Sequence, residues 1–449
     1  MVIKQHRIIL NLYQKTIAVF ILVILFGAIL LALPFASQTG NSCGFLTALF
    51  TSTSAVCVTG LFKVDIWTQF TLFGQIVLLL LLQIGGLGFM SIITVFFHLF
   101  NRREGIQSLS LSAESLRTDN FQNLKRIQMR LLIGSLCFES VGALILFFCF
   151  LPSMGFLKAA WFGIFHAISA FCNAGFDLMG AISPGAGMIC FQNHSIVLLT
   201  LSALIVIGGI GFLVWDDIAS SGHPRKWSVY TQIVISVSAF LILFGAGSFF
   251  FMEFHNPETI GNMNLGHQIV NSIFQAVTPR TAGFASIDQS SLSDSSIALT
   301  SLLMIVGGSA GSTAGGIKTA TFLIIFMTIL SNLQGKKNVT IFHRTVSHEQ
   351  LQYAFAISGG FVLLSITGGF LIAFSSDIPF AHAFFESISA ISTVGLSLGV
   401  TASLSPVSSL IVILLMYTGR VGLLTLTLGF FKAREDLSIK YPSAKLIIG

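Results

Sequence analysis

The sequence predicts an all-α integral membrane protein whose eight transmembrane helices form four membrane–pore loop–membrane repeats around one pore. Apolar residues make up 54% of the 449 positions and charged residues only 9%, against roughly 25% charged residues in soluble domains. Four short hairpins rich in Ser, Thr and Gly also recur in apolar surroundings, and each ends at a glycine: Gly60, Gly175, Gly283 and Gly395. Because irregular backbone at membrane depth must be buried in protein or line water, four such segments predict the four walls of one pore.

Each repeat has the same order of elements, namely a helix, a half-helix, a hairpin and a second helix. The half-helices are expected near residues 44–55, 158–170, 265–277 and 379–390. They are too short to cross a hydrocarbon core that needs about 20 residues, which favours re-entrant segments. The spanning helices are expected near residues 16–33, 71–100, 127–151, 193–220, 230–252, 296–330, 350–374 and 405–431. The repeats then occupy residues 1–105, 106–222, 223–340 and 341–449.

The distribution of charge predicts the orientation in the cell membrane. Most of the 23 lysines and arginines lie before the first helix, between repeats or after the last helix. Positive loops stay in the cytoplasm, so both termini are expected inside and the hairpins enter from outside. The opposite loops carry Asp65, Asp177, Glu253, Glu258, Asp288, Asp294 and Asp377. An acidic mouth would concentrate cations, although ordinary solvated loop charges remain an alternative, and the basic inner face explains the net charge of +6 without a nucleic-acid partner.

A glycine-rich run interrupts the second helix of the third repeat. Five glycines fall between Gly307 and Gly316, just before Lys318. Each glycine costs about 1 kcal/mol in a helix relative to alanine, so an ordinary helix is not expected. A phosphate-binding loop is disfavoured because Ile317 separates the last glycine from the lysine. A flexible intramembrane loop below the hairpins is the preferred interpretation, and a close helix-packing site is the alternative.

Two arginines also lie in apolar or hairpin sequence, where a charge is a functional candidate by default. Arg420 is expected inside the last helix, either as an electrostatic barrier to cations or as a residue whose guanidinium is satisfied by backbone carbonyls. Arg280 lies in the third hairpin and is interpreted as structural, since five donors allow it to fix a loop. Glu386, in the fourth half-helix, is its expected counter-charge.

Four motifs resemble the Trk/Ktr/HKT superfamily of potassium transporters, most closely its bacterial Ktr type with KtrB-like membrane subunits. The motifs span Thr51–Leu61, Asn173–Phe176, Arg280–Phe284 and the glycine-rich Gly307–Thr319. The resemblance runs from the first expected helix to the last. It departs from the family pattern at Pro279, where a small non-proline residue is expected.

The resemblance implies one selectivity filter built from four hairpins, with one glycine per repeat. Glycine at all four positions favours K⁺, since plant members with serine at the first position conduct sodium. The expected filter carbonyls belong to Cys57, Val58, Thr59 and Gly60; Cys172, Asn173, Ala174 and Gly175; Thr281, Ala282 and Gly283; and Ser392, Thr393, Val394 and Gly395. We expect Gly60 to need a positive φ or a close backbone approach.

The resemblance also implies a gate, partners and ions. The expected gate comprises Gly307, Gly308, Gly311, Ser312, Thr313, Gly315, Gly316, Lys318 and Arg420. The expected partners are a second copy of the chain, a separate cytosolic ring of nucleotide-binding RCK (KtrA-like) subunits and membrane lipid. K⁺ is the expected transported ion, with Na⁺ as an activator or co-ion and no organic cofactor.

Two other classes of protein compete with this interpretation. A secondary transporter for a small solute would usually have two inverted repeats with a midplane site, whereas four repeats with one order of features are indicated here. A membrane enzyme would need intramembrane carboxylates or histidines in a cluster. Glu139 and Glu386 are the only glutamates expected inside helices, so the sequence predicts a transporter and not an enzyme.

Overall fold

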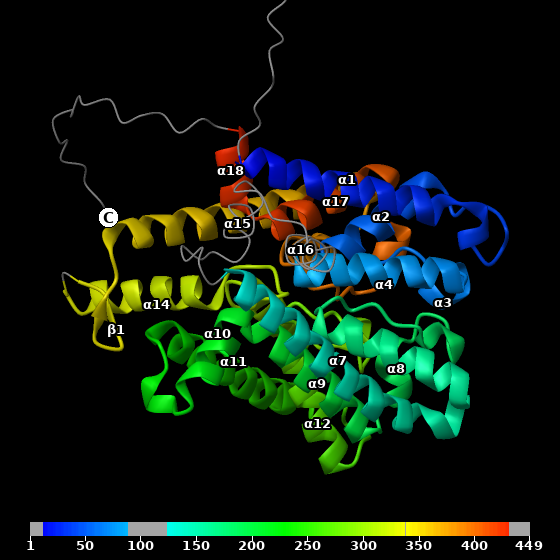
Figure 1. Cartoon of the computed structure of the whole chain (residues 1–449), viewed down its shortest axis with the longest axis horizontal. Coiled ribbons are helices and arrows are strands. Elements are labelled where there is room, and N and C mark those ends of the chain that lie inside the picture. Colours follow the sequence, from blue (N-terminus) through cyan, green and yellow to red (C-terminus); the bar gives the residue numbers. More distant parts are fainter. Residues whose placement is uncertain (1–11, 89–123, 337, 431–449) are drawn as a thin grey trace, which may run out of the picture.

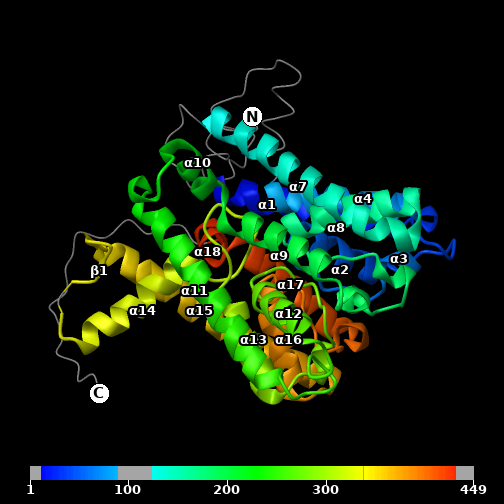
Figure 2. The same cartoon turned by 90° about the horizontal axis from the view of Figure 1, so that it is seen from below.

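A computed structural model describes residues 12–88, 124–336 and 338–430. This part of the chain is mainly helical, as predicted, and its helices form one bundle from which α14 and strand β1 project at one end (Figures 1 and 2). The helices of the first half are α1 (Leu12–Ala32), α2 (Phe45–Val56), α3 (Ile66–Gln69), α4 (Leu72–Leu87), α7 (Leu124–Met154), α8 (Phe156–Phe171), α9 (Ser195–Ile210) and α10 (Phe212–Ser221). Those of the second half are α11 (Val229–Glu253), α12 (Leu265–Val277), α13 (Asp294–Ile305), α14 (Thr319–Leu333), α15 (His348–Ser376), α16 (Phe380–Ile391), α17 (Pro406–Val421) and α18 (Leu423–Phe430).

Short elements join these helices. Strands β1 (Thr340–Ile341) and β2 (Arg344–Thr345) pair antiparallel before α15. The 3₁₀ turns are η1 (Pro34–Ala36), η2 (Met179–Ala181), η3 (Gly187–Phe191), η4 (Pro224–Lys226), η5 (Gln289–Ser291) and η6 (Thr401–Ser403). Helix α15 begins with a capping box in which Ser347 and Gln350 satisfy each other's backbone N–H groups, which fixes its first turn.

Four helices in the described part of the chain, α1, α7, α11 and α15, are long and apolar enough to cross a membrane. At most 39% of the most apolar window of each is buried inside the protein. Large apolar side chains therefore remain on the outside, among them Phe251 and Phe374. In water such a surface would be unfavourable, whereas lipid tails solvate it. The chain is a multi-pass membrane protein.

The four expected half-helices are present as α2, α8, α12 and α16, each within a few residues of its predicted bounds. Their inward faces are fully buried, with Phe50, Phe165, Phe274 and Phe385 at most 1% exposed. The C-terminal parts of the four short helices, which lead into the hairpins, thus lie in the interior of the bundle.

Two helices expected to be continuous are broken at a glycine. Residues 193–220 form α9 and α10, which are bent by 89° at Gly211. Residues 405–431 form α17 and α18, which are separated by Gly422. Both glycines have φ near 90°, which a right-handed helix does not contain. Helix α4 ends at Gly88 in the same way, with φ of 81°, and the rest of the expected 71–100 helix lies outside the described residues.

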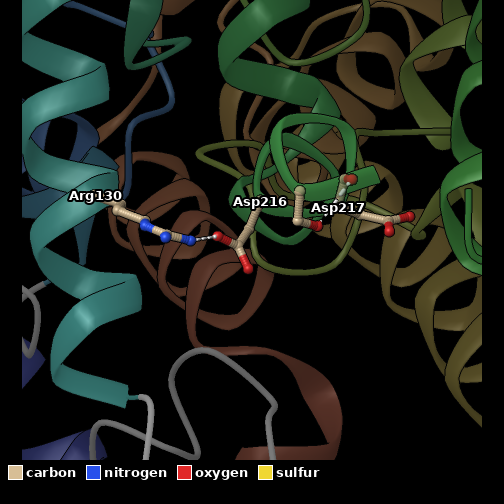
Figure 3. A network of polar contacts seen from close by, with 4 residues as sticks. Arg130, Asp216 and Asp217 are labelled. Atoms are coloured by element: carbon tan, nitrogen blue, oxygen red, sulfur yellow. Dashed lines mark hydrogen bonds and ion pairs between the residues drawn. The ribbon is translucent and has the colours of Figure 1, made fainter. Parts of the chain in front are cut away.

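Helix α10 is held in its bent position by two adjacent aspartates. Asp216 pairs with Arg130 of α7 at 2.7 Å, and Asp217 faces the other way (Figure 3). Asp217 accepts hydrogen bonds from the Ser228 backbone N–H at 2.9 Å and from the Thr231 hydroxyl at 2.5 Å, at the start of α11. The bent segment is therefore tied on one side to α7 and on the other to α11.

Candidate functional site

Each hairpin begins where a short helix ends, and a hydroxyl residue in the last turn shapes it. The carbonyl of Ser54 accepts the N–H of Thr59 at 2.8 Å, and its hydroxyl accepts the N–H of Gly60 at 3.0 Å. Ser389 makes the same two contacts with Val394 and Gly395, at 2.8 and 3.0 Å. These bonds satisfy N–H groups that would otherwise be unpaired at membrane depth, so the hairpins are fixed from behind.

The backbone takes the same unusual course in all four hairpins. Positive φ values of 53–73° occur at the second residue before each glycine, namely Val58, Asn173, Thr281 and Thr393. The glycines Gly60, Gly175, Gly283 and Gly395 themselves have φ values of 92°, 69°, 80° and 96°. Three of the four non-glycine residues are β-branched, for which this conformation is strongly disfavoured. Strain of this kind costs about 1–3 kcal/mol per residue and concentrates at functional sites. The expected positive φ at Gly60 is confirmed.

The four glycines form a closed ring. A Cβ atom placed on any one of them would collide with the carbonyl oxygen of the residue before the glycine of the next hairpin, at 2.5 Å for Gly60 and 2.6 Å for Gly175. The contacts run in one direction, from Gly60 to Ala174, from Gly175 to Ala282, from Gly283 to Val394, and from Gly395 to Thr59. Four segments that are far apart in sequence therefore surround one axis and meet backbone to backbone.

The third hairpin is one residue shorter than the others. Thr278 precedes Gly283 by five positions, where Ser54, Ser169 and Ser389 precede their glycines by six. Its hydroxyl still bonds the chain beyond the glycine, donating to the Phe284 carbonyl at 2.6 Å, as Ser169 does to Phe176 at 2.7 Å. Pro279 lies in the shortened part, and the ring closes nonetheless.

The expected pairing of Arg280 with Glu386 is wrong. Arg280 is 8% exposed and donates to the Ser238 hydroxyl of α11 at 3.0 Å. Glu386 accepts from the Thr401 hydroxyl at 2.5 Å. The two side chains contact different neighbours, so Arg280 joins the third hairpin to α11 and not to the fourth half-helix.

The glycine-rich run forms a compact loop between α13 and α14, as the broken-helix prediction requires. Gly307 N–H donates to the Ile317 carbonyl at 3.0 Å, and Thr319 N–H donates to the Gly308 carbonyl at 3.3 Å. The two ends of the loop are thus pinned together as a short parallel bridge. Lys318 Nζ donates to the Ala314 carbonyl at 2.6 Å, inside the same loop.

The loop lies against the bend between α9 and α10. Ser309 N–H donates to the Gly209 carbonyl, and Phe212 N–H donates to the Gly311 carbonyl, both at 3.0 Å. Its far side reaches two hairpins. Thr313 lies within hydrogen-bond distance of the Phe171 carbonyl at 3.4 Å, and a Cβ on Gly315 would lie 3.0 Å from the Ser392 carbonyl. The loop therefore adjoins the ends of the second and fourth short helices.

Arg420 occupies the last turn of α17 and contacts the loop directly. Its guanidinium donates to the carbonyls of Thr313 in the loop and of Gly85 in α4, and reaches the Gly86 carbonyl at 3.5 Å. Of the two expected roles, the contacts agree with an arginine satisfied by backbone carbonyls. Arg420 is the second residue of a Gly-x-x-Gly motif that runs from Gly419 to Gly422. Two other helices end in the same motif, at Gly88 and at Gly211, and both have glycine at the second position.

Two acidic residues lie in loops next to the ring. Asp177 follows the second hairpin and accepts the Met179 N–H at 2.9 Å. Burial raises the pKa of Asp177 to about 6, and the nearby charge of Asp65 acts in the same direction. Asp65 accepts the Thr68 N–H at 2.9 Å and the Gly185 N–H at 3.2 Å. Asp65 and Asp177, both among the acidic loop residues expected from the sequence, therefore lie near each other.

The sequence did not predict that backbone carbonyls of α4 and α9 accept hydrogen bonds from Arg420 and from the loop. The carbonyls of Gly85, Gly208 and Gly209 receive Arg420 or the loop. Glycine pairs on α4 and α9 are the signal that could have identified them, because Gly85 and Gly208 each lie directly against the carbonyl that ends a short helix. Gly419 lies in the same way against the carbonyl of Ile391, which ends α16.

Comparison with known proteins agrees with this geometry. The profile of the TrkH family, described as cation transport protein, matches residues 4–441. The chain belongs to the TrkH family. It is 36% identical over 452 residues to the potassium/sodium uptake protein NtpJ of Enterococcus hirae, covering 99% of both chains. It is also 36% identical to the Ktr system potassium uptake protein B of Bacillus subtilis, over 96% of this chain and 95% of the relative.

A solved structure shares the fold. The potassium transporter TrkH from Vibrio parahaemolyticus superposes with a TM-score of 0.73 at 17% identity, over 95% of this chain and 86% of that chain. Membership in a cation transport family confirms the prediction of a transporter and not an enzyme.

Proposed function

We propose that this chain is the membrane subunit of a potassium uptake system and passes K⁺ through the ring of four glycine hairpins. The observation that carries the proposal is the closed cycle of glycine-to-carbonyl contacts. Only glycine allows the four backbones to meet at this distance, and rings of backbone carbonyls can replace the hydration shell of a cation. The names of NtpJ and of the Ktr system protein support potassium as the ion.

The proposed architecture is eight membrane-crossing units in four repeats, at residues 1–105, 106–222, 223–340 and 341–449. Its support is the recurrence of one order in the described residues, namely a short helix, a hairpin with positive φ and a second helix. Basic residues between the repeats favour a cytoplasmic position for both termini.

Permeation then follows from the backbone and the membrane potential. Carbonyls near Thr59, Ala174, Ala282 and Val394 surround the dehydrated ion. The C-terminal ends of α2, α8, α12 and α16 each present roughly half a negative charge to the space below the ring. Inward movement of each K⁺ gains about 2.3 kcal/mol per 100 mV of negative-inside potential.

The loop at residues 306–318 is the proposed gate, and hydrogen bonds from Lys318 and Arg420 hold it in place. Its contacts with Phe171 and with the end of the fourth short helix support a position on the inner side of the ring. The bonds from Arg420 to Thr313 and Gly85 hold it there. Movement of the loop would clear the path.

The proposed partners are a second copy of the chain, lipid, and a separate cytosolic ring of RCK (KtrA-like) subunits. The description of two relatives as proteins of a Ktr system supports a multi-component assembly. Na⁺ is the proposed activator or co-ion, which the name of NtpJ supports.

Growth and uptake in potassium-auxotrophic cells test the function. Cells that carry the chain are expected to grow at low K⁺ and to accumulate Rb⁺, more so with the ring subunits present. Normal membrane insertion with no Rb⁺ or K⁺ uptake in either condition would reject the proposal.

A further inference from the structure

The four short helices carry a polar side chain at one common position, which the ring itself does not use. It lies three residues before the hydroxyl residue that opens each hairpin. The four side chains are at most 1% exposed, and they are Thr51, His166, Gln275 and Glu386. Burying a polar group in this way is costly unless it is hydrogen-bonded, so each of these side chains needs a partner inside the protein.

Three of these side chains reach across to the chain that returns from the ring. His166 Nε2 accepts the Leu178 backbone N–H at 3.2 Å, and its Nδ1 donates to the Phe162 carbonyl at 2.7 Å. Because one ring nitrogen must accept and the other donate, these contacts select a neutral imidazole. Leu178 directly precedes the 3₁₀ turn η2.

The third and fourth repeats use the same position in the same way. Gln275 and Gln289 exchange two hydrogen bonds, at 2.8 and 3.2 Å. Glu386 Oε1 accepts the Thr401 hydroxyl at 2.5 Å, while its buried Oε2 has no partner. Gln289 begins η5 and Thr401 begins η6. In three repeats, therefore, the side chain holds the first turn that follows the hairpin.

The first repeat differs. The Thr51 hydroxyl donates to the Thr47 carbonyl of its own helix at 2.8 Å. Its return segment is held from outside the repeat, by Lys63, whose Nζ donates to the Leu404 carbonyl and to the Ser409 hydroxyl, both at 2.9 Å. Thr51 is thus a buried polar residue at the same position without the same contact.

We propose that His166, Gln275 and Glu386 are positioning residues that set the ion selectivity of the ring. This inference rests on the proposed function. Each hairpin carries two positive-φ residues and is held at its start by a hydroxyl residue. In the second, third and fourth hairpins the side chain at the common position fixes the other end, so the spacing of their carbonyls depends on both supports. Loss of the second support lets the carbonyls close on a smaller ion.

The test compares variants of the whole chain by Rb⁺ uptake in competition with Na⁺, scaled to inserted protein. Glu386→Leu and Thr401→Val remove the same bond from opposite sides. Each is expected to lower the preference for Rb⁺ over Na⁺ by roughly fivefold to tenfold, as for one unsatisfied buried hydrogen bond. Because they share one contact, the double variant is expected to lose no more than either single one.

Two controls separate positioning from folding. Glu386→Gln keeps an oxygen that can accept the Thr401 hydroxyl, so it should show the parent's preference for Rb⁺ over Na⁺, unlike Glu386→Leu. Thr51→Val removes an equally buried hydroxyl and should leave the preference unchanged. The Gln275→Leu and Gln289→Leu variants repeat the test in the third repeat. If the parent selects Rb⁺ while inserted Glu386→Leu and Thr401→Val keep its preference, the inference is overturned. A parent without selective uptake overturns the proposed function instead.

Discussion

The guanidinium of Arg420 donates directly to the carbonyl of Thr313, which joins the end of α17 to the glycine-rich loop. The same side chain also binds Gly85 in α4. One residue thus links the loop to two helices that belong to opposite ends of the sequence. Arg420 therefore holds the proposed gate in place through its hydrogen bonds and also places a positive charge beside it.

Removal of Arg420 should therefore free the loop. Arg420→Ala is expected to raise maximal Rb⁺ uptake per inserted protein, with little change in selectivity because the ring is intact. The variant leaves buried carbonyls without a hydrogen-bond donor, so its free energy of unfolding is expected to be lower than that of the parent by about 1–3 kcal/mol. Arg225→Ala, in the exposed η4 turn, is the control and should change neither quantity. Uptake per molecule that stays equal or falls would leave Arg420 with a packing role alone.

Shortening the loop tests the gate independently. Deletion of residues 311–316 removes Thr313 and Gly315, which contact Phe171 and lie beside Ser392. Flux is expected to rise and to depend less on the cytosolic ring, because the obstruction is gone. Rb⁺ uptake with and without ring subunits measures both effects. Normal insertion with lower flux than the parent would show that the loop is structural.

The four-glycine ring makes a prediction about side chains. Gly60→Ser and Gly283→Ser should weaken the preference for K⁺ over Na⁺, since a Cβ there meets the Ala174 or the Val394 carbonyl. Gly399→Ser is a matched control, because Gly399 has a φ of 84° and open space where a Cβ would lie. It carries the same backbone strain without the collision and should keep the preference. If Gly60→Ser and Gly283→Ser keep the same preference for K⁺ over Na⁺ as the parent and the Gly399→Ser control, the ring is not the filter.

The raised pKa of Asp177 predicts a pH dependence. Its folded value of about 6 exceeds the ordinary 3.8, so the native protein binds more protons between these values, and its stability falls as pH rises from about 4 to about 6. Above pH 6 the carboxylate is ionised and should concentrate cations at the mouth. The apparent KM for K⁺ is expected to decrease as pH rises through about 6. Asp177→Asn should abolish this step, and the exposed Asp288→Asn should retain it.

Much of the fold could be predicted because membrane depth restricts the options. Apolar stretches too short to span, each followed by a glycine hairpin, located all four short helices, and residues 265–277 coincide with α12. The breaks at Gly211 and Gly422 were not predicted. Helical segments lie on both sides of these glycines, and the positive φ that breaks each helix is not visible in the sequence pattern.

The site was predicted less completely, because the sequence gives the charge of a side chain but not the neighbour that it contacts. Arg280 was assigned to Glu386 as its opposite charge, whereas it binds the neutral Ser238. The glycine ring could be predicted as four separate hairpins. Its cyclic order could not, since that order arises from contacts between residues more than 100 positions apart.

Locating the ion tests the central claim most directly. Crystals of the full chain grown in Rb⁺ should show an anomalous scattering peak on the axis between Gly60, Gly175, Gly283 and Gly395. The peak should lie within coordination distance of the carbonyls of Thr59, Ala174, Ala282 and Val394. Replacement of Rb⁺ by Na⁺ should remove it. An axis without a peak, in crystals of protein that transports Rb⁺, would contradict the account.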